Sequence, residues 1–267
     1  MPQRSQTTAP TAILLAIDGD GKRGTLRPDR CRALPLMELL HAKAVWCAEK
    51  KLNVNLEKLP ELTGMDSQRL PLQGTHDHAH WIPLSLFDDR HIDHVLVYAA
   101  GGFTSDSVRA IGQLRSAYSK GISKLAISLV GQGTISEIYS QLSRVSGIRR
   151  SSLAILRPSN VFESATPMVF RKFLSSRGKK MPENQIREEL LERGLPEPSK
   201  IGFWSSAELM NRKLKGFVLR RQSSKRQPPF ERSCGLTLQF SEYVDSVPFA
   251  LGYASHFGLG LFAAVDL

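Results

Sequence analysis

The chain has 267 residues, 41% of them hydrophobic, and a formal net charge of +11 at pH 7. This length allows one large domain or two small ones, and the hydrophobic content is sufficient for packed cores. The apolar run at residues 11–17 is too short for a signal peptide or a membrane span, and the three cysteines lack the paired spacing of a disulfide scaffold, so we expect a soluble cytoplasmic protein.

Hydrophobic periodicity predicts the order β-α-β-β-α-β for the first half. An apolar run that ends at a Gly-Asp-Gly turn predicts the first strand, and apolar residues at i, i+3 and i+4 from Leu34 onward predict the first helix. The predicted strands are 11–18, 78–84, 94–100 and 124–131, and the predicted helices are 34–47 and 105–118. This order is that of a ferredoxin-like unit.

The second half is predicted to contain short strands and one clear helix. The helix begins with Pro182 at its first position and runs to about Arg193, and Gly194 suits the position after its last turn. Its apolar side would be formed by Ile186, Leu190 and Leu191. The strand candidates are 152–156, 167–173, 201–204, 216–219, 236–240 and 249–253.

We therefore predict an α+β fold with two tandem ferredoxin-like (RRM-like, βαββαβ) domains. The first would comprise residues 1–145 and the second residues 146–267, with the junction in the polar segment 144–152. The second domain would be basic and would end in a glycine-rich loop.

The positive charge is concentrated in the middle of the chain. Residues 144–232 hold 20 basic and 8 acidic residues, a net of +12, whereas residues 1–143 have a net of +2 and residues 233–267 a net of −3. A basic region of this kind favours a polyanionic partner, nucleic acid, over a solvated face kept for solubility. The candidate phosphate contacts are Arg171, Lys172, Arg220, Arg221, Lys225 and Arg226.

Three glycines near the C-terminus surround one histidine. Gly252, Gly258 and Gly260 would let the backbone approach a bulky ligand, and exposed N–H groups in such a loop suit phosphate. The alternative is a tight hairpin or bulge. If the loop binds RNA through these glycines and Ser255, His256 would lie beside a scissile phosphate, where a histidine can act as base or acid without a metal.

Two further groups of histidines are candidates for chemistry. His76, His78 and His80 alternate, so on a strand they share one face, and His91 and His94 lie at the start of the next predicted strand. If these strands pair, we expect the imidazoles to converge. Three interpretations stay open: a polar strand end whose histidines bond the backbone, a proton-transfer site, and a metal site, the last matching no closed zinc motif.

His41 lies on the polar side of the first predicted helix, close to Lys43, whose cation could stabilise charge on a phosphorane. The chain contains no Gly-x-Ser-x-Gly hydrolase motif, no Walker loop and no dinucleotide fingerprint. The catalytic candidates are thus His256, His78, His94 and His41.

Two stretches resemble a known family. Residues 74–83 (GTHDHAHWIP) followed by 91–99 (HIDHVLVYA), and residues 248–262 (PFALGYASHFGLGLF), resemble the crRNA-processing half of the fused subunit of type I-U (I-G) CRISPR systems, a member of the RAMP superfamily. Residues 163–167 (ESATP) add a weaker match. The resemblance covers about residues 11–262 and implies two ferredoxin-like domains with a C-terminal glycine-rich RNA-binding loop.

The resemblance also implies metal-independent cleavage of CRISPR repeat RNA that leaves a 2′,3′-cyclic phosphate. We therefore expect an endoribonuclease that binds and cuts precursor crRNA, needs no cofactor or metal, contacts no membrane, and stays on the mature crRNA with other subunits of a type I CRISPR effector complex (Cascade). The alternatives are a RAMP subunit that caps the crRNA end without cutting, and a metal-dependent phosphoesterase built on the histidine strand.

Overall fold

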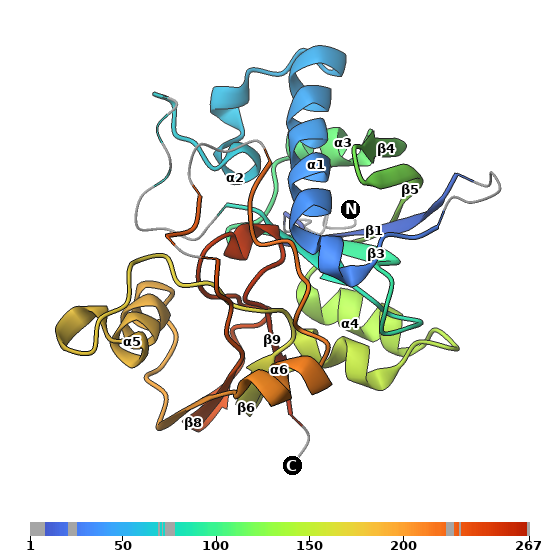
Figure 1. Ribbon diagram of the computed structural model, residues 1–267. Coiled ribbons are helices and arrows are strands. Elements are labelled where there is room, and N and C mark those ends of the chain that lie inside the picture. Colours follow the sequence, from blue (N-terminus) through green and yellow to red (C-terminus); the bar gives the residue numbers. More distant parts are fainter. Residues whose placement is uncertain are drawn as a thin grey trace, which may run out of the picture.

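The computed structural model of the chain describes residues 9–20, 26–68, 70, 72, 78–222, 227–229 and 231–265. Within these residues the chain forms two antiparallel sheets with helices packed around them (Figure 1). The N-terminal half, drawn in blue and green, builds the first sheet, and the C-terminal half, drawn from yellow to red, builds the second.

The first sheet has five strands in the order β2-β3-β1-β5-β4. Its half of the chain contains β1 (Ala12–Gly19), α1 (Ala33–Trp46), α2 (Pro60–Thr63), β2 (His80–Leu84), β3 (His94–Tyr98), α3 (Ser105–Gly112), β4 (Ser116–Ser119), β5 (Ile122–Gly133) and α4 (Ile135–Ser143). Without β4, which pairs with β5 as a hairpin at the edge, this is the strand order of a ferredoxin-like unit. The predicted order of this half is therefore confirmed.

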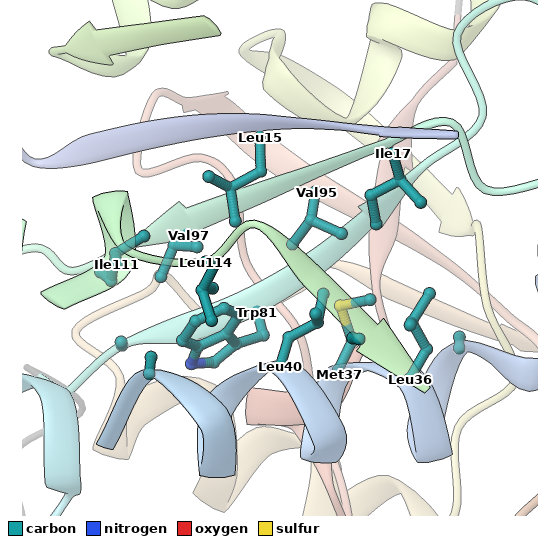
Figure 2. Packing of buried hydrophobic residues seen from close by; sticks show 14 of the residues in the cluster. Leu15, Ile17, Leu36, Met37, Leu40, Trp81, Val95, Val97, Ile111 and Leu114 are labelled. Atoms are coloured by element: carbon teal, nitrogen blue, oxygen red, sulfur yellow. The ribbon is translucent and has the colours of Figure 1, made fainter. Parts of the chain in front are cut away.

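The central strand β1 is apolar along its length because both faces of the sheet are covered. Leu15 points into the core beneath α1, whereas Leu14 points into a second cluster that includes residues of α4. Figure 2 shows Met37 and Leu40 of α1 directed at the sheet around the fully buried Trp81 of β2. The apolar stripe predicted for this helix is thus its buried face.

The predicted helix 105–118 is wrong in its second half. The helix α3 ends at Gly112, and residues 116–119 form β4, which turns back at Gly121 with a φ of +82°. Leu114 matches the helical spacing and is fully buried, but it lies in the connection between α3 and β4. Burial rather than helical structure therefore explains its place in the pattern.

The second sheet has four strands in the order β7-β8-β6-β9. Its half contains β6 (Ser159–Ser164), α5 (Pro182–Glu192), β7 (Lys200–Phe203), α6 (Ser206–Asn211), β8 (Leu236–Val244) and β9 (Phe262–Ala264). The strand order repeats that of the first sheet, so the fold is α+β with two tandem ferredoxin-like units. Between β8 and β9, where such a unit has its second helix, the described chain has the glycine-rich segment with a single 3₁₀ turn, Ser255–Phe257.

Four of the six strand candidates in this half are wrong because their apolar residues pack in irregular segments. Residues 150–156 form a 3₁₀ helix, and the strand that follows, β6, has no counterpart among the predictions. Residues 167–173 and 249–253 contribute only isolated bridges, at Met168 and Ala250, and residues 216–219 form no strand. The helix α5 is confirmed, including the positive φ of Gly194, but Leu191 is 78% exposed and lies outside its buried side.

Two of the three hydrophobic clusters contain residues of both halves, and the third contains residues of the second half alone. Val169 and Leu259 of the second half belong to the cluster beneath α1, and Leu261 belongs to the cluster around α4. The division into domains at residues 145 and 146 stays a prediction. None of the helices in the described ranges is long and apolar enough to cross a membrane.

Candidate functional site

Three histidines from the two halves of the chain lie in ring contact. The imidazole of His256 stacks on that of His78, with ring centroids 3.7 Å apart and an interplanar angle of 25°, and its centroid lies 4.0 Å from that of His80. The rings of His78 and His80 are 6.3 Å apart. We call these three residues the histidine cluster. His76, the other member of the alternating set, lies outside the described residues.

Backbone geometry brings the turn of His256 against β2. This strand is the edge of the first sheet, and the 3₁₀ turn Ser255–Phe257 packs along it. Gly258, directly after the turn, has a φ of +82°, and a Cβ atom there would lie 2.7 Å from Cδ of Pro83 in β2. A residue without a Cβ atom is therefore required where the turn meets the strand.

The other two glycines of the loop are explained by contacts within the chain. The N–H of Gly252 donates to both carboxylate oxygens of Glu189, at 2.9 and 3.0 Å, and the N–H of Gly260 donates to the carbonyl oxygen of Pro167. Both glycines are buried. The expected cradle of exposed amides for phosphate is therefore not present at these two positions, because their N–H groups are already bonded.

A buried ion pair connects α5 to the turn of His256. The Nη2 atom of Arg193 donates to the Glu189 carboxylate at 2.7 Å and to the hydroxyl of Ser255 at 3.1 Å. Both charged side chains are at least 94% buried, and Ser255 is 3% exposed. Sequence reasoning missed this pair. Its i, i+4 spacing was visible, but that spacing is also common on exposed helix surfaces.

His91 and His94 lie away from the histidine cluster, contrary to the predicted convergence. Strands β2 and β3 do pair, but His94 is opposite Leu84, whereas His80 is opposite Tyr98 at the other end of the ladder. The Nδ1 atom of His94 lies 2.8 Å from the buried Asp93 carboxylate, and His91 contacts Asp88. For these two residues the structure favours a role in holding the loop before β3.

His41 lies on α1 and is not part of the histidine cluster, but it packs against the 3₁₀ turn that carries His256. Its Nε2 atom is 3.0 Å from the carbonyl oxygen of Leu62, and its ring packs edge-on against those of Trp81 and Phe257. Burial lowers the pKa of His41 to about 4, so the ring is neutral at pH 7 and is a poor proton donor there. Lys43 lies on the same helix and is partly exposed.

The low pKa of His41 predicts a loss of stability in acid. Its folded pKa of about 4 is below the ordinary value of about 6.5, so between these values the unfolded chain binds more protons and stability falls as the pH falls. From pH 8 to pH 5 the expected loss through this residue is about 2 kcal/mol. Urea denaturation at both pH values should show this loss in the parent but not in His41→Gln. An equal loss in both proteins would contradict the assignment.

Most of the basic candidates have acidic partners in the fold. Arg171 and Lys172 contact Glu192 and Glu188 of α5, at 2.7 and 2.9 Å. Arg220 pairs with Glu231, and Arg221 pairs with Glu38 while its guanidinium lies 4.5 Å above the ring of Phe257. Lys225 and Arg226 lie outside the described residues. Whether any of these residues contacts RNA stays a prediction.

The rings of the histidine cluster are stacked and tilted against one another, not arranged around a common point. The lone pairs of an imidazole lie in the plane of its ring, so stacked rings direct them outward and not at one shared point. In the part of the chain that the structure describes, no group of three or more His, Cys, Asp or Glu residues is arranged to hold a metal ion. His80 also lines a cavity of about 770 Å³ between the two halves, which gives the cluster a neighbouring space for a ligand.

Comparisons with known proteins give structural likenesses only. No family model and no curated protein matches the chain. A solved structure of the CRISPR-associated protein Cas6 is 9% identical, with 96% of this chain and 100% of that chain covered and a TM-score of 0.46. A RAMP protein described as binding different RNA substrates is 13% identical (96% and 99% covered, TM-score 0.44), and the product of a Cas6-related gene from Pyrococcus furiosus is 9% identical (96% and 99% covered, TM-score 0.44).

Proposed function

We propose that this chain binds RNA and cuts it by metal-independent acid–base catalysis at the histidine cluster. The observation that carries the proposal is the ring contact of His256 with both His78 and His80, which come from the other half of the chain. Cleavage of RNA through its own 2′-hydroxyl needs one group that accepts a proton and one that donates a proton, and imidazole serves either step near neutral pH.

The reaction would proceed by in-line attack. One neutral imidazole takes the proton of the 2′-hydroxyl, whose oxygen bonds to the adjacent phosphorus. The bond from phosphorus to the 5′-oxygen breaks, and a protonated imidazole gives its proton to that oxygen. The products are a 2′,3′-cyclic phosphate and a free 5′-hydroxyl, and protons balance between the two imidazoles.

Ring contact supports a division of these roles. Two unit positive charges 4 Å apart repel each other by about 4 kcal/mol at an effective dielectric constant of 20. Protonation of His256 therefore disfavours protonation of the rings on either side, at 3.7 and 4.0 Å.

The substrate that we propose is CRISPR repeat RNA, on the basis of the two motifs at residues 74–99 and 248–262, and the cut guide would stay bound within a type I effector complex. The net charge of +12 over residues 144–232 supports a polyanionic partner. In this proposal the two ferredoxin-like units are domains that divide near residue 145.

A non-catalytic RAMP subunit that binds the crRNA end is the second candidate. The low exposure of His80, 7%, favours it, because an acid or base must reach the phosphate. In that case the role of the three imidazoles would be structural, to pack the glycine-rich segment against β2.

Incubation of the protein with the repeat RNA of its host in excess EDTA tests the proposal. We expect a single cut and a product that carries a 2′,3′-cyclic phosphate. Binding without a cut would support the non-catalytic subunit, and a cut that EDTA abolishes would support a metal-dependent phosphoesterase. Either result would overturn the proposed mechanism.

A further inference from the structure

The cavity beside the histidine cluster lies where the two halves of the chain meet. It has a volume of about 770 Å³ and is bounded by the start of α4, by residues 156–158, by the end of α5 and by the segment that follows β8. This volume is within the range of small-ligand sites in proteins, about 300–1,000 Å³. Because His80 lines the cavity and also contacts His256, a ligand in the cavity would lie next to the cluster.

Arg193 brings a buried cation to the cavity wall. Its side chain is 6% exposed, and both of its hydrogen bonds use Nη2, so Nε and Nη1 donate to none of the described residues. A buried donor without an acceptor is costly, and the cost is relieved when a ligand supplies the acceptor. The planar guanidinium suits the oxygens of a phosphate.

Other groups on the wall match an anion with an aromatic part. Arg157 adds a second guanidinium. The first turn of α4 also lines the cavity, but the Glu137 carboxylate already accepts from the N–H of Thr134 at 2.7 Å, so we assign no anion contact to this helix end. Tyr98, Tyr139 and Tyr243 supply aromatic rings. Asp245 is the one carboxylate among the residues that line the cavity in the described ranges, so cationic groups outnumber it.

We propose that this cavity holds one unpaired nucleotide of the RNA substrate, adjacent to the phosphate at the histidine cluster. Its phosphate would contact Arg193 and Arg157, and its base would stack on the tyrosines. This inference rests on the proposed function, because it takes the histidine cluster as the place where the RNA is cut and puts the nucleotide next to it. It follows that the RNA must be single-stranded at this nucleotide, since a base within a duplex cannot enter.

Tyr243→Ala and Arg157→Gln test the cavity by RNA binding, without reference to cleavage. Tyr243 is 70% exposed, so its loss should leave the fold intact, and Tyr118→Ala on β4 is a matched control at 72% exposure. The probe is the host repeat RNA with a 2′-deoxynucleotide at the cut, or the unmodified RNA if the parent does not cut it. Stacking on aromatic rings contributes about 1–3 kcal/mol per base, so Tyr243→Ala should weaken binding by about 5- to 150-fold.

Arg157→Gln should reduce the slope of log affinity against log salt by about 0.7, the value for one phosphate contact on single-stranded RNA. Tyr118→Ala should bind within about twofold of the parent. Removing the base from the nucleotide beside the cut should abolish the difference between the parent and Tyr243→Ala.

These experiments distinguish a wrong proposal for the cavity from a wrong proposal for the function. If the parent cuts RNA while Tyr243→Ala and Arg157→Gln bind like the parent, the cavity proposal is wrong and the function stands. If the parent binds RNA without cutting and both variants bind more weakly, the nucleotide site stands and the catalytic proposal is wrong. If the parent does not bind the RNA, both are wrong.

Discussion

His256→Ala should slow RNA cleavage by about 10²- to 10⁴-fold under single-turnover conditions, the usual effect of removing a general acid or base. Binding of the same RNA should stay within about threefold of the parent, because the imidazole contributes little to the electrostatic attraction of the phosphates. His256 is the cluster member to change first because its ring contacts both of the others.

His91→Gln is the matched control for this prediction. His91 is a partly buried histidine of the same half as His78 and His80, but its ring contacts Asp88 and lies outside the cluster, so cleavage by this variant should be close to that of the parent. A His256→Ala rate within about threefold of the parent would show that His256 only packs beneath the turn. The assignment of catalysis to the cluster would then be wrong.

Gly260→Ala should destabilise the fold by about 3 kcal/mol or more and lower the melting temperature by about 6–12 °C. Gly260 has a φ of +63°, and a Cβ atom there would lie 1.8 Å from the carbonyl oxygen of Leu251. Relief of this overlap would disrupt the hydrogen bond from the N–H of Leu251 to the carbonyl oxygen of Gly260, now 2.9 Å long. Thermal denaturation followed by circular dichroism measures the effect.

Gly216→Ala is the control that separates the two causes of destabilisation, the steric overlap of the new Cβ atom and the strain of a positive φ. Gly216 has a φ of +90°, but no heavy atom lies within 4 Å of the Cβ position. This variant should therefore lose only about 1 kcal/mol, the cost of a left-handed conformation for an ordinary residue. Equal losses in the two variants would mean that the close approach of Leu251 and Gly260 does not limit the loop.

The first half of the fold was predictable because its elements follow simple periodicity. The strand at residues 12–19 is one continuous apolar run bounded by a turn, and the helix at 33–46 has apolar residues at helical spacing. In the second half, segments such as 167–173 and 249–253 are apolar yet irregular. Val169 and Ala250 are buried against the first half of the chain, whereas their apolar neighbours are buried in the second half's own cluster. A sequence pattern does not show which apolar run is buried without a strand partner.

The candidate site was predictable in its residues but not in its assembly. Alternation correctly placed His78 and His80 together, but nothing in the spacing indicated that His256, more than 170 residues later, would lie between them. The predicted convergence of His94 failed because the register sets it opposite Leu84. The glycine pattern predicted space for a ligand, whereas the space beside Gly252 and Gly260 is occupied by atoms of this chain, from Glu189, Pro167 and Leu251.

The central claim is that the chain cuts RNA through the 2′-hydroxyl of the substrate by acid–base catalysis. The most direct test is the single-turnover cleavage of host repeat RNA in excess EDTA, compared with the same RNA that carries one 2′-deoxynucleotide at the cut. We predict that the all-RNA substrate is cut to a 2′,3′-cyclic phosphate and that the deoxy substrate is bound but not cut. Cleavage of the deoxy substrate at a similar rate, or no cleavage of either, would contradict the account.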